Sequence, residues 1–282
     1  MCLVLIGWRA HPDYRLIVAA NRDEYHVRRS TALQTWPEAP GLIAGRDLDC
    51  GSAGPGIWLG LRRDDPEYRF AAITNVHDGG QARPDAGSRG GIVRDFLCEN
   101  RDSPQQYAHR VTSAADEALP GYQLLVCDLR DLWWAGNRST SSPRRLDPGF
   151  HAVGNDAEPH AVNDEGAAAE GAASLKARRG LEAFAATVAT TTGSIESYFT
   201  MLSDRTPVPA DGGSAGGLPP TLHRMFSARF VSNSLYGTRC STVVLIREDG
   251  TYTVAERSYG PRGRRVDDVA FEGRMATVGG LR

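Results

Sequence analysis

The sequence contains almost no lysine. Of its 32 basic residues only Lys176 is a lysine, and 34 acidic residues bring the formal net charge to −2. A chain so close to neutrality has no field of one sign to attract nucleic acid or an anionic membrane surface. We therefore expect no nucleic-acid partner.

The chain also lacks the residue spacing that metal sites and disulfide frameworks need. Its five cysteines are odd in number, and no two of them form a Cys-x-x-Cys pair: Cys2, Cys50, Cys98, Cys127 and Cys240. Its seven histidines show no His-x-x-x-His spacing. We expect reduced thiols, no metal and no resident cofactor.

Long apolar runs are missing as well. The run that starts at residue 3 is too short for a signal peptide, and no stretch approaches the roughly 18 apolar residues of a membrane span. These absences predict a cytoplasmic protein without a membrane span. With 41% hydrophobic residues, the 282 residues are enough for one large core, and we expect a single domain over 1–282.

Strand-like segments occupy both ends of the chain, and helical patterns lie between them. Apolar, β-rich runs predict strands at 3–9, 15–20, 239–247, 252–258 and 270–277. Helices are predicted at 88–99, 104–118, within 164–190 and at 195–202. This order is not a regular βαβ alternation, which argues against a doubly wound dinucleotide fold. It predicts an α+β protein whose sheets combine the first and last strands and are covered by helices.

Two local signals are sharper than the rest. Ser103 is followed by Pro104 and, three residues on, by Gln106, which is a capping-box start for a helix. Residues 122–128 and 132–135 flank a short turn and predict a β-hairpin.

The chemistry of the chain centres on Cys2. A cysteine directly after the initiator methionine is small enough for Met1 to be removed, which would leave a thiol and a free α-amine on one residue. The reference pKa values of these groups are about 8.5 and about 7.7–8.0, so the amine can serve as the base for its own thiol. The alternative is that Cys2 only begins a strand as a small buried hydrophobe. Residues 21–24, Asn-Arg-Asp-Glu, follow the second predicted strand, where a hairpin would return them toward Cys2.

The ordered set of motifs resembles the NRDE family, which takes its name from that tetrapeptide and includes the eukaryotic transport and Golgi organisation proteins. The resemblance spans essentially the whole chain. Its further landmarks are residues 56–60, 74–75, 88–90, 151–155 and 236–242. The family's Gly-Leu-Ser-Asn sequence is replaced here by Ala-Val-Gly-Asn at 152–155, so only the final asparagine matches.

The resemblance implies an N-terminal nucleophile hydrolase with a four-layer αββα sandwich of mostly antiparallel sheets. It assigns the nucleophile to Cys2, the carboxylate that holds it to Asp23, and the oxyanion donors to Asn75 and Asn155. An ordering arginine falls on Arg239. The arginine that related cysteine amidases carry just before the motif has no counterpart, and Arg22 is the candidate to replace it. An arginine beside a thiol raises its thiolate fraction, and side-chain amides aimed at an oxyanion stabilise the transition state.

Each of these residues also has a purely structural interpretation. Arg22 and Asp23 can form a turn with an ion pair, Asn75 and Asn155 can stabilise turns, and Arg239 can pair with an acidic neighbour.

Three functions follow from these alternatives. The first is hydrolysis of a non-peptide carbon–nitrogen bond of an N-acyl compound through a thioester. The second is non-catalytic carriage of haem or a lipid-like hydrophobic ligand, as the resemblance to eukaryotic members suggests. The third is a structural or partner-binding protein with a vestigial cleft.

Overall fold

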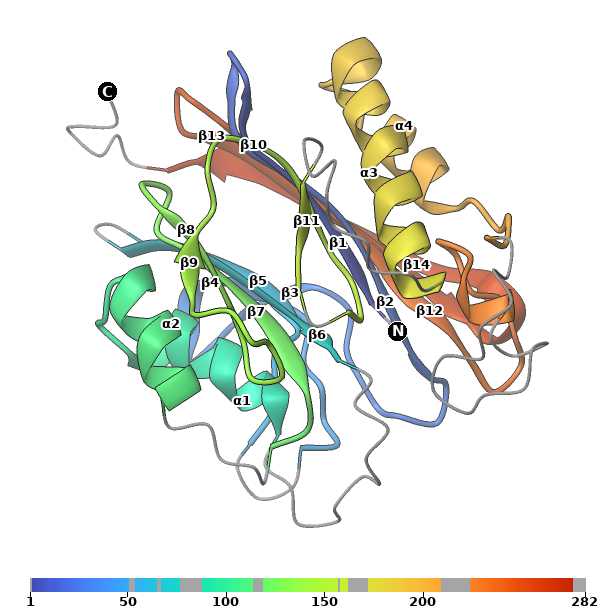
Figure 1. The fold of residues 1–282 in the computed structure, drawn as a ribbon, viewed down its shortest axis with the longest axis horizontal. Helices are drawn as coiled ribbons and strands as arrows, with labels where there is room; N and C mark the ends of the chain where they lie inside the picture. Colours follow the sequence, from blue (N-terminus) through green and yellow to red (C-terminus); the bar gives the residue numbers. More distant parts are fainter. Residues whose placement is uncertain are drawn as a thin grey trace.

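Two seven-stranded β-sheets form the framework of the part of the chain that the structure describes (Figure 1). The computed structural model describes residues 2–50, 54–64, 67–76, 88–113, 119–156, 158–161, 172–208 and 224–275. Neighbouring strands pair antiparallel in both sheets. The predicted α+β class with mostly antiparallel sheets is confirmed.

The first sheet joins strands from both ends of the chain, as predicted. Its order is β11-β10-β1-β2-β12-β13-β14. Its strands are β1 (Leu3–His11), β2 (Tyr14–Tyr25), β10 (Gly149–Val153), β11 (His160–Ala161), β12 (Tyr236–Arg247), β13 (Thr251–Gly260) and β14 (Arg264–Arg274). The first two strands therefore lie beside the last three, with β2 directly paired to β12.

The second sheet follows the order of the chain, β3-β4-β5-β6-β7-β8-β9. Its strands are β3 (Gln34–Trp36), β4 (Ala39–Ala44), β5 (Leu59–Asp64), β6 (Glu67–Asn75), β7 (Tyr122–Cys127), β8 (Leu132–Gly136) and β9 (Arg144–Arg145). The predicted hairpin is the β7–β8 pair, so that prediction is confirmed.

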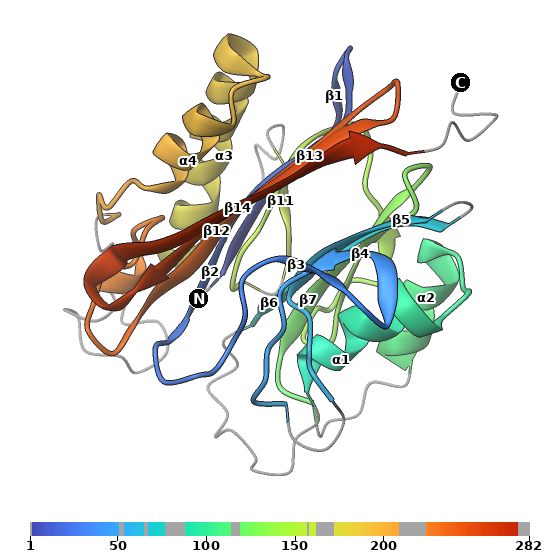
Figure 2. The same ribbon diagram turned by 180° about the vertical axis from the view of Figure 1, so that it is seen from behind.

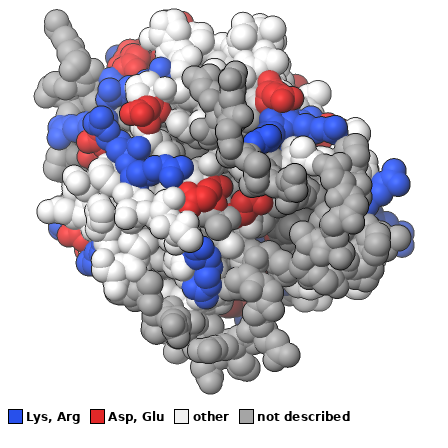
Figure 3. Space-filling view, in the orientation of Figure 1, with Lys and Arg blue, Asp and Glu red and all other residues white. Residues whose placement is uncertain are grey.

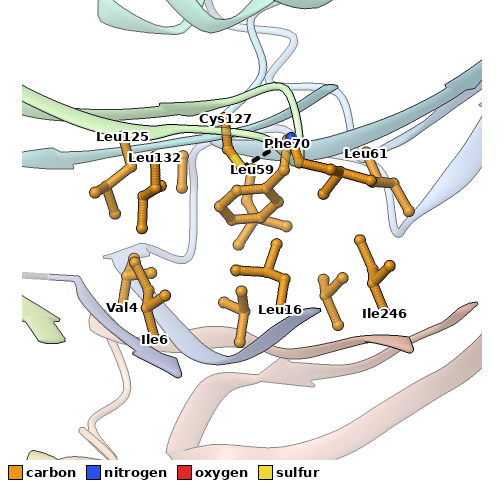
Figure 4. Packing of buried hydrophobic residues seen from close by; sticks show 14 of the residues in the cluster. Val4, Ile6, Leu16, Leu59, Leu61, Phe70, Leu125, Cys127, Leu132 and Ile246 are labelled. Carbon is orange, nitrogen blue, oxygen red and sulfur yellow. Dashed lines mark hydrogen bonds between the residues drawn. The ribbon is translucent and has the colours of Figure 1, made fainter. Parts of the chain in front are cut away.

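An apolar core fills the space between the two sheets (Figure 4). Alternate residues of each strand point into it, as the two-residue period of a β-strand requires. From the first sheet come Val4, Ile6 and Leu16, and from the second come Leu59 and Phe70. All five side chains are completely buried.

Helices cover the outer face of each sheet (Figures 1 and 2). On the first sheet α3 (Ala172–Thr191) and α4 (Ile195–Leu202) pack over the residues that alternate with the inner ones, such as Leu3 and Ile17. On the second sheet lie α1 (Arg89–Arg94), its π-helical continuation Asp95–Glu99, and α2 (Pro104–Ser113).

The α2 helix begins at the predicted capping box. The backbone N–H of Gln106 donates to Ser103 Oγ at 3.3 Å, and the backbone N–H of Ser103 donates to Gln106 Oε1 at 3.1 Å. We predicted this helix to residue 118. It ends at Ser113 in the described chain, and residues 114–118 lie outside it.

Three predicted boundaries were wrong or fall partly outside the described residues. The tetrapeptide at residues 21–24 does not follow β2 but lies inside it, because β12 supplies cross-strand partners for its polar side chains. The last strand covers Arg264–Arg274 instead of 270–277, since it pairs along the whole of β13. Within 164–190, residues 164–171 lie outside the described chain.

Candidate functional site

Cys2 lies at the start of β1, with 6% of its surface exposed and its thiol free. Leu3 pairs with Asn21 on β2, so one further step along that antiparallel register places Cys2 opposite Arg22. On the other side of β1, Val4 pairs with Val153, the last residue of β10. Continued two steps past the end of that strand, the same register would bring Asn155 opposite Cys2, so we infer that Cys2 lies between two of the predicted site residues.

These positions fall in one row that crosses β2, β12 and β13 and passes the ends of β1 and β10. Cys240 on β12 pairs with Arg22, and Ser258 on β13 pairs with Cys240. We name this set the polar row: Asn155, Cys2, Arg22, Cys240 and Ser258. Strand alternation points its side chains toward the second sheet, because Val4, Ala20 and Val153, two positions away, belong to the core between the sheets.

The neighbouring residues of the tetrapeptide face the helices on the opposite side of the sheet. Asn21 Nδ2 donates to the carbonyls of Leu202 at 3.0 Å and Arg229 at 2.8 Å, while its Oδ1 accepts a hydrogen bond from Ser241 Oγ at 2.6 Å. Asn21 is completely buried. This asparagine holds the end of α4 against the sheet.

Asp23 forms a buried ion pair with the single lysine of the chain. Lys176 Nζ on α3 lies 3.0 Å from Asp23 Oδ2, and the two side chains are 4% and 0% exposed. Thr238 Oγ1 donates to Asp23 Oδ1 at 2.7 Å. Both carboxylate oxygens therefore have partners on the helix side of the sheet, and the thiol of Cys2 points to the other side.

Arg22 makes its ion pair between the sheets. Its Nη2 lies 3.0 Å from Asp47 Oδ2, and Arg28 Nε donates to the same oxygen at 2.8 Å. Arg22 is 6% exposed. Of the two charged residues at the centre of the tetrapeptide, Arg22 is the one that shares the face of Cys2.

Asn155 and Asn75 are in contact through the side chain of Asn155 and the backbone carbonyl of Asn75. Asn155 Nδ2 donates to the Asn75 carbonyl at 2.6 Å, which links the first sheet to the end of β6. This bond occupies one of the two amide protons of Asn155. The contact that brings Asn75 to the site is its backbone oxygen.

Gln123 is a second link between the sheets that the sequence analysis missed. It is completely buried on β7, where its Oε1 accepts from Trp134 Nε1 at 2.8 Å and its Nε2 donates to the Asp156 carbonyl at 2.5 Å. The available signal was a single amide in the apolar strand sequence Tyr-Gln-Leu-Leu-Val-Cys. Gln123 fixes the backbone next to Asn155.

Arg239 orders the chain at the end of β2 and just after it. Its Nη1 donates to the carbonyls of Tyr25 and Arg28, each at 2.8 Å. Burial lowers the pKa of its guanidinium, and the charge of Arg22 lowers it further. The structure therefore connects Arg239 to the site through its effect on Arg22 and on the 25–30 segment.

A cavity of about 390 Å³ lies beside the far end of the polar row. Arg22, Cys240 and Ser258 contribute to its wall, together with Trp58 and Tyr259. Cys2 is not among the described residues that line it.

Glu256 is a buried carboxyl group in the cavity wall that the sequence analysis also missed. Its residue is 3% exposed, its Oε1 accepts from the backbone N–H of Leu33 at 2.9 Å, and its Oε2 accepts from Thr242 Oγ1 at 2.9 Å. Burial raises the pKa of Glu256. Burial, with the Glu256 carboxylate second, also raises the pKa of the Cys240 thiol well above its ordinary value, so Cys240 is a poor nucleophile.

The described histidines do not form a metal centre. His160 Nε2 pairs with Asp156 Oδ2 at 2.8 Å, and His151 Nε2 contacts the Asp147 carbonyl at 2.8 Å. Within the described ranges no group of three or more metal-binding side chains comes together.

None of the described helices combines the length and apolarity that crossing a bilayer needs. On the face in Figure 3, basic and acidic side chains are interspersed.

The structure and site define an α+β protein of two antiparallel sheets, built around an N-terminal strand headed by a buried cysteine. The chain belongs to the Transport and Golgi organisation 2 family, whose pattern matches residues 1–261. The family resemblance predicted from the sequence is therefore confirmed.

Curated relatives cover most of the chain. A transport and Golgi organization protein 2 homolog from Bos taurus is 30% identical over 276 residues, which are 92% of this chain and 93% of that protein. The Homo sapiens homolog is 28% identical over 275 residues, with the same coverage of 92% and 93%. A Mus musculus homolog is 32% identical over 164 residues, 55% of this chain and 57% of that protein.

Proposed function

We propose that this protein is an N-terminal cysteine hydrolase that cleaves the carbon–nitrogen bond of a non-peptide N-acyl compound. The observation that carries the proposal is the position of Cys2 at the head of β1, between Asn155 and Arg22 in the polar row. We further propose that the two sheets and their covering helices are the four-layer αββα arrangement of N-terminal nucleophile hydrolases, formed by one domain over residues 1–282.

The proposed reaction begins after removal of Met1. The α-amine of Cys2 accepts the thiol proton, and the sulfur attacks the acyl carbon. The carbon–nitrogen bond then breaks, the amine product leaves with that proton, and a thioester to Cys2 remains. Water, deprotonated by the same α-amine, hydrolyses the thioester and releases a carboxylic acid. The thiol is regenerated, so each cycle consumes one water.

Asn155 and Arg22 are the proposed donors near the developing negative charge. The second amide proton of Asn155 is the one available to an oxyanion, because the first is bound by the Asn75 carbonyl. A well-placed donor of this kind contributes about 3–4 kcal/mol to transition-state stabilisation. Arg22 supplies a positive charge on the face of the thiol, where it can stabilise negative charge that develops during the reaction. In this proposal Asp23 and Arg239 hold the surrounding elements in place.

The second candidate is non-catalytic carriage of haem or a lipid-like ligand. The observation that favours it is the cavity beside the polar row, whose volume falls within the roughly 300–1,000 Å³ of small-molecule sites. The wall includes the rings of Trp58 and Tyr259 beside the apolar Pro261 and Val266. A carrier would use this cavity without needing Cys2.

An intact-mass measurement with thiol labelling separates the two functions. We expect the purified protein to lack one methionine and brief treatment with iodoacetamide near pH 7 to label Cys2 ahead of the other four cysteines, although Cys50 and Cys98 are more exposed. A screen of N-acyl amides then gives products with the wild type and none with Cys2→Ala. Retained Met1, with no preferential labelling of Cys2, would overturn the hydrolase proposal. Ligand binding that survives Cys2→Ala without turnover would favour the carrier.

A further inference from the structure

The ion pair between Lys176 and Asp23 is costly to bury. Its two side chains are 4% and 0% exposed, and Lys176 extends from a helix whose neighbouring inward residues, such as Ala177 and Leu181, pack in an apolar cluster. Replacement of a buried ion pair by apolar residues is often neutral or stabilising. The pair is therefore poorly explained by stability alone.

The position of the pair relative to Cys2 suggests another role. Cys2 lies opposite Arg22 in the extended register, and its backbone nitrogen is on the side away from Leu3, toward the position opposite Asp23. Removal of Met1 turns that nitrogen into an α-amine. From this register we infer that the Asp23–Lys176 pair lies next to the amine that accepts the thiol proton.

A nearby carboxylate raises the pKa of such an amine, and a nearby lysine ammonium lowers it. A nearby Asp23 carboxylate alone would stabilise the ammonium form and remove the base from use at neutral pH. The Lys176 ammonium, 3.0 Å from the same carboxylate, offsets that attraction and repels a second positive charge. The reference pKa of an α-amine is about 7.7–8.0, so a modest shift of this pKa decides whether the amine is protonated at pH 7.

We propose that Lys176 is a positioning residue that keeps the α-amine of Cys2 unprotonated at neutral pH by neutralising Asp23. The inference rests on the proposed removal of Met1 and deepens the proposed function of the same site. Lys176 acts through Asp23 and makes no contact with the acyl group.

Several other charged groups around this end of β1 have ion-pair partners, whereas Arg239 on β12 bonds the carbonyls of Tyr25 and Arg28. On the inner face Arg22 is bound to Asp47, and on the helix side Arg229 is bound to Asp204. On β10 and β11 the charged pair is Asp156 with His160. The strand register and the ion pair together indicate that the charged groups nearest the α-amine on β2 and α3 are Asp23 and Lys176.

The scarcity of lysine makes the inference directly measurable. With Lys176 as the only lysine, acetic anhydride can acylate two amines, the α-amine and Lys176, and in Lys176→Met only the α-amine remains. Acylation of the Cys2 peptide is followed by mass spectrometry from pH 5 to 10, because only the unprotonated amine reacts. The chains are co-expressed with a methionine aminopeptidase, and Cys2 is protected as a reversible disulfide during labelling.

We expect Lys176→Met to slow acylation at pH 7 about tenfold and to move the midpoint of the pH profile upward. Lys176→Arg keeps the charge and should restore the wild-type profile. The double variant Asp23→Asn with Lys176→Met removes both charges and should also return the midpoint toward wild type. If Lys176→Met alone fails to fold, Asp23→Asn with Lys176 retained supplies the test, because the uncompensated ammonium should move the midpoint downward.

Two results would overturn the inference. One is an unchanged midpoint in Lys176→Met, and the other is a shift of equal size in Lys176→Arg. Retention of Met1 despite the aminopeptidase would overturn both this inference and the hydrolase proposal. A trimmed protein that shows the expected shifts but hydrolyses no N-acyl amide would contradict only the proposed function.

Discussion

Arg22 and Asp23 are adjacent in the chain, but their side chains lie on opposite faces of the first sheet. Arg22 reaches Asp47 between the two sheets, while Asp23 reaches Lys176 on α3. Both are almost completely buried. They point to opposite faces because successive residues of a β-strand alternate between the two sides of its sheet. Arg22 therefore shares the face of Cys2, whereas Asp23 anchors α3. Substitutions of Arg22, Asp23, Glu256 and Gln123 test the roles that the structure gives these buried side chains.

Arg22→Gln should slow the alkylation of Cys2 by iodoacetamide at pH 7 by about three- to tenfold, because the thiolate loses a neighbouring positive charge. The rate is measured by mass spectrometry of the Cys2 peptide. Arg9→Gln is the matched control, since Arg9 bonds the Arg130 carbonyl at the far end of β1. An equal rate in Arg22→Gln and wild type would contradict the prediction.

Asp23→Ala should lower the free energy of unfolding by about 3–5 kcal/mol, because Lys176 is left as an unpaired buried charge. Urea unfolding followed by tryptophan fluorescence measures the change. Adding Lys176→Met to Asp23→Ala should recover much of the loss. If the double variant is less stable than Asp23→Ala, the two residues do not act as a pair.

Glu256→Gln should flatten the pH dependence of stability. The folded protein raises the pKa of Glu256 by burial, so in the window between the unfolded and the folded pKa the native state binds more protons than the unfolded state. Stability from this group is fully present below the unfolded pKa, about 4.3, and is lost as the pH rises through the folded pKa. Glutamine does not ionise in this range, so Glu256→Gln removes this loss of stability with rising pH. Urea midpoints from pH 4 to 8 should fall less steeply in the variant, and parallel curves would contradict the raised pKa.

Gln123→Leu should destabilise the protein by about 1–3 kcal/mol, because the indole N–H of Trp134 loses its acceptor inside the core. It should also slow Cys2 alkylation, since the amide fixes the backbone at Asp156, next to Asn155. Gln106→Ala, in the exposed capping box, is the control: it should cost stability without changing the reactivity of Cys2. A Cys2 rate in Gln123→Leu equal to that of the control would contradict the positional role.

Local signals predicted local structure well. The Ser103–Gln106 capping box and the β7–β8 hairpin depend on residues only a few positions apart, and both formed as expected. The tetrapeptide at 21–24 was misplaced because its polar side chains suggested a loop. Their partners Thr238 and Ser241 lie on β12, more than 200 residues later.

Contacts between residues far apart in the sequence also limited the prediction of the candidate site. The family pattern pointed to Cys2 and Asn155, which lie just beyond the paired ends of β1 and β10. No local signal indicated that Lys176 would pair with Asp23, because the two are separated by 153 positions and the lysine lies in an alanine-rich helix. Glu256 and Gln123 looked like ordinary strand residues until their burial was known.

The strand order of the two sheets has a consequence for the timing of synthesis. The second sheet follows the order of the chain, so its hairpins can form while the ribosome is still working. The first sheet cannot close until β12, which begins at Tyr236, leaves the exit tunnel. At roughly 5–20 residues per second, this leaves β2 without its neighbour β12 for roughly tens of seconds. During that interval a ribosome-associated aminopeptidase can reach the first residue of the chain before the sheet is complete.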